Sequence, residues 1–183
     1  ALAAQQQTAD AVAAYLAFAD QNREHPLAPE AYWQAALLLD QDGELVEAAK
    51  AYTLLADRHI NDRRAPTARF RAGMTRYRVG DVDAALVAWR ELANGYPASA
   101  EALAARYWIG KTLWAQGEQQ EARQVLQQLA DEQPRDYYGL RAAHLLESSG
   151  RAVRWPSITE PPHLTSDTTA LDEETWIWVR GWA

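Results

Sequence analysis

The chain has 183 residues, enough for one domain with a sizeable core, and its 48% hydrophobic and 23% charged residues are ordinary for a folded protein. Its 25 acidic and 18 basic residues give a formal net charge of -7, which argues against electrostatic binding of nucleic acid or of an anionic membrane. The absence of cysteine excludes disulfides, thiol nucleophiles and cysteine-ligated metals, and no apolar run is long enough to predict a membrane span.

An internal repeat organises most of the chain. Gly43, Gly80 and Gly117 lie 37 residues apart in both steps, and the residues around them recur in the same register. A period of this kind is the signature of a helical solenoid, in which each repeat packs on the next. The recurring columns are Trp33, Phe70 and Tyr107; Ala36, Gly73 and Gly110; Ala48, Ala85 and Ala122; Tyr52, Trp89 and Leu126; and Leu55, Leu92 and Leu129.

Each repeat predicts two helices, an A helix before the glycine and a B helix after it. Spacings of three and four place the aromatic and small residues of the A helix on one face. We expect the glycine to end that helix in the left-handed conformation, which it adopts at low steric cost. The small residue lets the A and B backbones approach each other, so a larger side chain there would overpack the hairpin. Pro97 and Pro134 end two of the B helices, because proline cannot continue an interior helical turn.

The repeats are predicted to extend over residues 1–150. In the last half repeat, we expect a helix that ends at Gly150 and carries Ala143 in the small-residue column. The predicted units are a half repeat at 8–25, full repeats at 28–62, 65–98 and 99–134, and a half repeat at 135–150.

The pattern breaks after the repeats. Residues 151–171 are rich in proline, serine and threonine, a composition that predicts a linker. Residues 172–183 begin a further helix, rich in tryptophan, which the end of the chain truncates. We therefore interpret the chain as a fragment of a larger protein.

The order of the columns resembles the tetratricopeptide repeat, most closely from Trp108-Ile109-Gly110 to Pro134. The period of 37 exceeds the usual value of about 34, so the connections between units are slightly longer. This resemblance implies an all-α fold, a right-handed α–α superhelix built as a solenoid of antiparallel helix pairs. Such a solenoid presents an extended concave face, lined mainly by the A helices.

A narrower resemblance covers residues 101–149. The segments Arg106-Tyr107-Trp108-Ile109-Gly110-Lys111 and Asp136-Tyr137-Tyr138-Gly139-Leu140 are similar to the last repeats of soluble lytic transglycosylases, in which a helical superhelix precedes a lysozyme-like catalytic domain. This resemblance implies the non-catalytic scaffold or binding region of a peptidoglycan-cleaving enzyme, in the periplasm or outside the cell. The alternative is a tetratricopeptide adaptor that mediates a protein–protein interaction and has no enzymatic activity.

No residue of the chain is predicted to be catalytic. The transglycosylase glutamate stands in a Glu-Ser motif, but Glu147-Ser148 lacks the Gly-Leu-Met-Gln-like segment that should follow, so the resemblance places any active site beyond Ala183. The four histidines show neither an i, i+4 pair nor an HExxH motif, so no metal site is predicted. No nucleophile elbow is present. No glycine-rich phosphate loop is present, so no cofactor is predicted either.

Three arginines and two aromatic residues of the A helices are candidates for binding. Arg69, Arg76 and Arg106 stand in columns where other repeats carry tyrosine or leucine. Each either contacts a ligand or buries its stem and pairs with a carboxylate. Tyr77 and Trp114 share a column and either offer a platform for sugar or peptide or pack between helices.

A sixth candidate, Lys111, lies in a column that other repeats fill with Leu37 and Met74. The lysine and asparagine clamp with which co-chaperone tetratricopeptide domains hold a peptide carboxylate is absent from the corresponding columns. The expected partners are peptidoglycan glycan strands or a protein or peptide in the concave groove, with no nucleic acid and no membrane span.

Overall fold

The computed structural model describes residues 2–148, with side chains from residue 6 onward. Every secondary-structure element in this range is a helix, which confirms the predicted all-α repeat solenoid. The predicted linker at 151–171, the helix at 172–183 and the helix end at Gly150 lie outside the described residues. The helices are α1 (Leu2–Gln21), α2 (Ala28–Gln41), α3 (Leu45–Arg58), α4 (Ala65–Arg78), α5 (Val82–Gly95), α6 (Ala100–Gln116), α7 (Gln119–Glu132) and α8 (Tyr137–Ser148).

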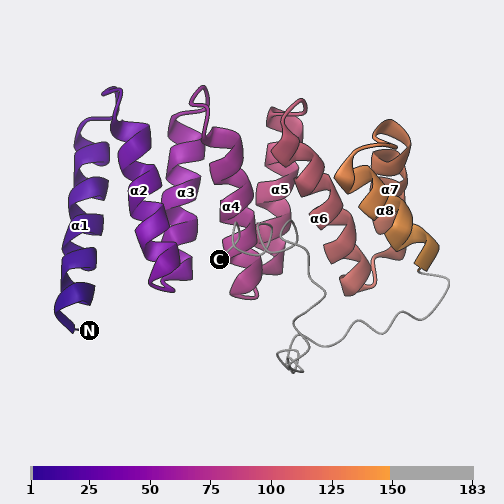
Figure 1. Ribbon diagram of the computed structural model, residues 1–183, viewed down its shortest axis with the longest axis horizontal. Helices are drawn as coiled ribbons and strands as arrows, with labels where there is room; N and C mark the ends of the chain where they lie inside the picture. The colour runs from indigo at the N-terminus through magenta and orange to yellow at the C-terminus, as the bar shows by residue number, and fades with distance from the viewer. Residues whose placement is uncertain (1, 149–183) are drawn as a thin grey trace, which may run out of the picture. The chain divides into compact units, whose positions relative to one another are not determined.

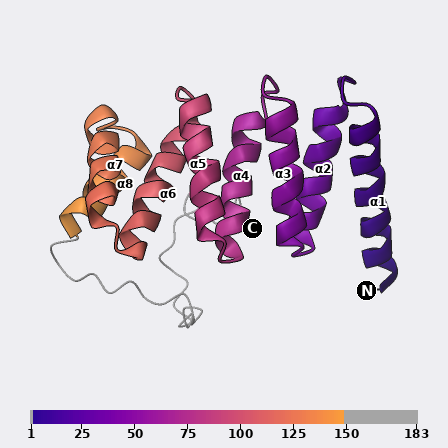
Figure 2. The same cartoon turned by 180° about the vertical axis from the view of Figure 1, so that it is seen from behind.

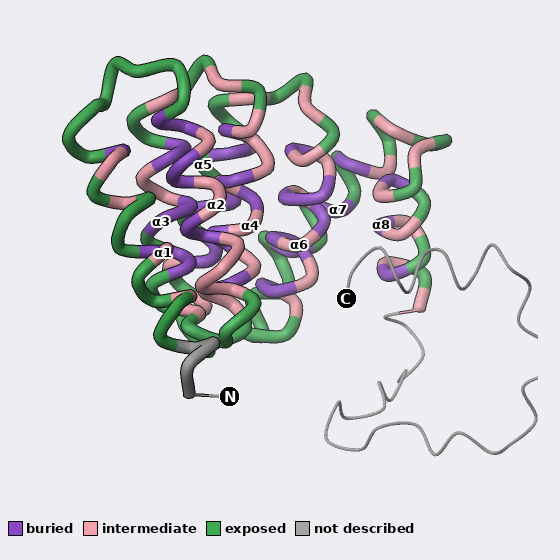
Figure 3. Tube along the Cα trace, turned by 60° about the vertical axis from the view of Figure 1, so that its left-hand side comes forward, coloured by how far each residue is buried: buried purple, intermediate pink, exposed green. Residues whose placement is uncertain are grey.

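The helices stand side by side in chain order, as Figures 1 and 2 show from opposite sides. The A helices α2, α4, α6 and α8 alternate with the B helices α1, α3, α5 and α7, and each helix packs mainly on its neighbours in sequence. In addition, α6 contacts the neighbouring A helices α4 and α8. Figure 3 shows that the buried residues lie on the helix faces that pack against one another, whereas many residues of the connections are exposed.

The turns repeat as closely as the helices do. Gly43, Gly80 and Gly117 have φ angles of 82°, 84° and 88°, which confirms the predicted left-handed conformation. In the last of these turns, the amide of Gly117 donates to the Trp114 carbonyl and the next amide donates to the carbonyl of Leu113. This pattern, the Schellman motif, satisfies carbonyls that the helix end would leave unpaired. Because the same bonds recur at the other two glycines, every hairpin turns in the same way.

The small-residue column is where the A and B helices approach most closely. A Cβ atom built on Gly73 would lie 2.3 Å from Nε1 of Trp89, and one on Gly110 would lie 2.5 Å from Cγ of Leu126. Trp89 is fully buried, and its indole also donates to the Phe70 carbonyl at 3.3 Å. The aromatic or leucine side chain of each B helix therefore occupies the space that the small residue of the A helix leaves open.

The last helix keeps the period of 37 instead of the shorter one that the prediction assumed, since α8 begins 37 residues after α6. Ala142 is 0% exposed, whereas Ala143 is only half-buried. Ala142 follows the buried Ala105 by 37 residues, so the period continues unchanged into α8. At this period Ala143 follows Arg106, and the small-residue column continues at Glu147. The prediction placed Ala143 in that column because it took Gly150 as the end of this repeat and thereby shortened the period.

We predict that Gly73→Ala destabilises the protein although alanine favours helices. The added Cβ must displace the buried Trp89 ring, at a cost of about 1–3 kcal/mol for overpacking, against a gain of up to about 1 kcal/mol in helix propensity. Urea unfolding followed by circular dichroism measures the net effect.

The matched control is Gly95→Ala, because a Cβ on Gly95 would meet no atom within 4 Å. This variant is expected to be as stable as the wild type or slightly more stable. If the Gly73→Ala variant were as stable as the control, the close approach of Gly73 to Trp89 would not be needed for stability.

Candidate functional site

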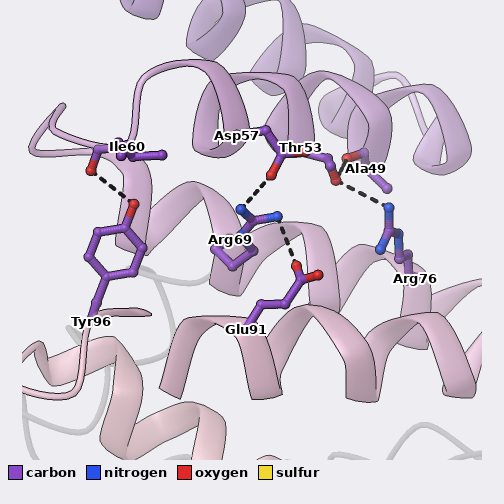
Figure 4. Close-up of polar contacts among 8 residues, drawn as sticks. All are labelled: Ala49, Thr53, Asp57, Ile60, Arg69, Arg76, Glu91 and Tyr96. Atoms are coloured by element: carbon purple, nitrogen blue, oxygen red, sulfur yellow. Dashed lines mark hydrogen bonds and ion pairs between the residues drawn. The ribbon is translucent and has the colours of Figure 1, made fainter. Parts of the chain in front are cut away.

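The three predicted arginines point toward the B helices. Arg69 on α4 forms ion pairs with Asp57 of α3 and Glu91 of α5, the latter at 3.0 Å, and its side chain is only 12% exposed. Arg76 donates to the Thr53 hydroxyl of α3 at 3.2 Å and to a carbonyl of α5 at 3.3 Å. Figure 4 shows both side chains between α3 and α5. Each arginine therefore ties its A helix to two B helices.

Arg106 continues this arrangement in the next repeat. Its guanidinium donates to Glu132 of α7 at 2.7 Å. In the first repeat the same column holds Tyr32, whose hydroxyl donates to Asp20 at 2.7 Å and accepts from Arg58. The column thus forms polar links between the A and B helices, and Arg69, Arg76 and Arg106 each have partners within the chain.

These links shift the pKa values of two carboxyl groups. Hydrogen bonds from Tyr32 and Arg58 lower the pKa of Asp20 below its ordinary value. Hydrogen bonds from Gln128 and Arg106 likewise lower the pKa of Glu132. In both cases the fold favours the charged carboxylate.

The other three candidates each contact aromatic or cationic side chains. Tyr77 of α4 lies 5.9 Å from the Trp89 ring and 5.7 Å from the Trp108 ring of α6. The Trp114 ring is half-buried and lies 5.5 Å from the guanidinium of Arg123. Both aromatic residues therefore pack between helices, and each keeps part of its surface open.

Lys111 lies in a patch that sequence analysis did not assemble. Its ammonium lies 4.4 Å from the centre of the Trp108 ring, at cation–π distance. From α8, Arg141 donates to the hydroxyl of Tyr137 at 2.9 Å and to that of Tyr107 at 3.2 Å. We call these five residues the α6–α8 patch.

The cations of this patch differ from those between the first two A helices. Between α2 and α4, Arg78 pairs with Asp40 at 2.6 Å and Arg64 pairs with Glu30. Arg141, in contrast, makes no ion pair with a carboxylate among the described residues; its partners are the two phenols. Burial, together with the charge of Arg141, lowers the pKa of Lys111. The patch therefore brings two cations together, and no described carboxylate pairs with Arg141.

One signal in the sequence could have found Arg141. Its column, read at the period of 37, holds Glu30, Thr67 and Ala104 before Arg141, so the charge reverses along the A helices. The shortened period assumed for the last repeat concealed this reversal.

Within residues 6–148 no cluster of histidine and carboxylate side chains is suited to a metal ion. None of the helices in the same range combines the length and the hydropathy that crossing a bilayer requires.

Comparison with known proteins identifies the repeat. A family model for the tetratricopeptide repeat matches residues 1–66 and 70–137. The chain is similar in structure to the nearly identical TPR-like repeats of a candidate kinesin light chain from Podosopora anserina, at 14% identity and a TM-score of 0.57, over 81% of this chain and 82% of that one. A point variant of the same protein gives 14% identity and a TM-score of 0.58 over 81% of each chain. No curated protein matches the chain.

We predict that the polar links weaken in acid. Because the pKa of Glu132 is lower in the folded state than in the unfolded chain, its contribution to stability is complete above about pH 5 and is lost as the pH falls through the folded-state value. The difference in unfolding free energy between the wild type and Glu132→Gln should therefore be largest near neutral pH and shrink toward pH 3. Urea unfolding at several pH values measures it, with the exposed Glu147→Gln as the control. A difference that does not change with pH would contradict the link.

Proposed function

Because the chain belongs to the tetratricopeptide repeat family, we propose that it is a protein-interaction module that holds a segment of a partner protein against its A helices. The repeats supply a rigid row of helices, and such solenoids bind along their exposed surfaces. The comparisons support this adaptor role more than a role in peptidoglycan cleavage.

The α6–α8 patch supports a partner that is acidic. Arg141 lies half-buried beside Lys111 and lacks a carboxylate partner within the described range. A carboxylate from outside would neutralise this charge, and a guanidinium can bind it through two parallel hydrogen bonds. The neighbouring Trp108 and Tyr137 rings offer apolar surface, and Tyr137 is half-exposed. The preferred ligand is therefore an acidic peptide segment that carries an aromatic residue.

A labelled peptide with several glutamates around one tryptophan tests this function by fluorescence anisotropy. It should bind about tenfold more tightly than the same peptide with glutamine in place of glutamate, and the preference should fall as salt is added. Arg141→Gln should remove most of the preference, because the guanidinium is the group that lacks a carboxylate.

Arg78→Gln is the matched control for this experiment. It removes an arginine from the same set of A helices, but one that Asp40 already neutralises. Binding should therefore hardly change. Equal affinity of the wild type for the glutamate and glutamine peptides would rule out the acidic ligand.

The resemblance of residues 101–149 to soluble lytic transglycosylases supports a second candidate, the scaffold region of a peptidoglycan-cleaving enzyme in the periplasm or outside the cell. The glycan would then stack on aromatic rings such as Trp114 and Tyr77, which keep part of their surface open.

Sedimentation with purified peptidoglycan distinguishes the two candidates. If the chain is a glycan-binding scaffold, it should sediment with the insoluble polymer, and Trp114→Ala should release it. If the wild type stays in the supernatant while it binds the glutamate peptide, the adaptor function stands and the glycan-binding role is ruled out.

A further inference from the structure

An apolar groove opens on the B-helix side at the beginning of the row. It has a volume of about 600 Å³ and lies between α1 and α3, above the end of α2. Val12 and Leu16 line it from α1, Leu54 lines it from α3, and Leu39 of α2 lies between them. None of the six candidate binding residues lines this groove.

The next repeat shows how the chain fills the equivalent space. At the period of 37, Leu39 corresponds to Arg76 and Leu16 to Thr53. Arg76 reaches across the space between α3 and α5 and donates to the Thr53 hydroxyl at 3.2 Å (Figure 4). Leu54 corresponds to Glu91, which pairs with Arg69 at 3.0 Å. Polar links within the chain thus close the space between α3 and α5, whereas the space between α1 and α3 has aliphatic walls.

The rim of the α1–α3 groove is acidic. Asp42, Glu44 and Glu47 all line it, and Lys50 is the cation beside them. Lys50 pairs with Glu47 at 2.6 Å, whereas Asp42 and Glu44 make no ion pair among the described residues. An occupant should therefore present apolar side chains to the walls and positive charge to the rim.

We propose that the α1–α3 groove docks an amphipathic helix of a partner protein, in which leucine-sized side chains fill the groove and adjacent lysine or arginine residues face Asp42 and Glu44. The proposal goes beyond the acidic ligand proposed for the α6–α8 patch, because it concerns other helices and the opposite charge. Buried apolar surface would supply most of the affinity, and the acidic rim would select a basic helix over an acidic one.

A labelled amphipathic peptide of leucine and lysine, about 18 residues long, tests the proposal by fluorescence anisotropy. We expect it to bind at least about tenfold more tightly than a peptide in which glutamate replaces lysine. Leu39→Arg should abolish this binding, because an arginine at the corresponding position, Arg76, fills the equivalent space in the next repeat. Equal binding of both peptides to the wild type would overturn the proposal.

Leu140→Arg is the matched control. It adds the same charge at a residue that is 56% exposed on α8 and does not line the groove. Binding must survive this change if the groove, rather than the net charge of the chain, holds the peptide. Ala13→Arg, at an exposed position of the groove wall, serves as a second blocking variant should Leu39→Arg disturb the fold. Unchanged binding in a folded Leu39→Arg or Ala13→Arg variant would refute the proposal.

Sedimentation velocity of the chain alone tests a different occupant, a second copy of this chain. We expect the wild type to remain monomeric at the concentrations used for the peptide. Concentration-dependent dimers that Leu39→Arg prevents would show that the groove binds another copy, and the proposed partner helix would then be wrong.

Discussion

The hairpins depend on the space between each A helix and the B helix that follows it. At Gly73 and Gly110 the backbone of the A helix lies so close to Trp89 and Leu126 that even a methyl group would collide with them. This contact sets how near the two helices lie, and the left-handed glycine between them sets how the chain returns. Because both features recur every 37 residues, each hairpin has the same form and stacks on the preceding one in the same way.

The regular backbone leaves the spaces between B helices free to differ. One column holds Leu39, Arg76 and Leu113 in successive repeats, and the surrounding residues change with it. The α3–α5 space is closed by arginine links, while the α5–α7 space is crossed by an ion pair between Arg90 and Glu121 at 2.8 Å. Only side-chain chemistry distinguishes these spaces from the apolar α1–α3 groove. Function in a repeat protein of this kind therefore lies in the departures from the repeat, since the shared positions maintain the stack.

This distinction explains which features the sequence could predict. The helices, the glycine turns and the close-packed column follow from residues that recur, so their period and spacing predicted them. The direction of Arg69 and Arg106 did not follow, because a long arginine on an A helix can reach either a neighbouring carboxylate or a ligand, and the carboxylates lie on other helices. Arg141 was missed for a different reason: a period shortened to fit Gly150 placed the residues of α8 in the wrong columns.

The two proposed surfaces differ in position and in charge. The α1–α3 groove has an acidic rim and lies near the beginning of the row, whereas the α6–α8 patch is cationic and lies near its end. A net charge of -7 would by itself favour basic partners everywhere, so a cationic patch requires that Lys111 and Arg141 be kept close together at some cost in repulsion and burial. Aromatic rings around both cations reduce that cost, because their faces attract positive charge without neutralising it. The rings thus hold the two cations in place, and the guanidinium of Arg141 would be the group that receives an acidic segment, while the acidic rim at the other end would select a basic helix. With no residue in common, the two surfaces can be occupied at once, which suits a scaffold that joins two partners of opposite charge.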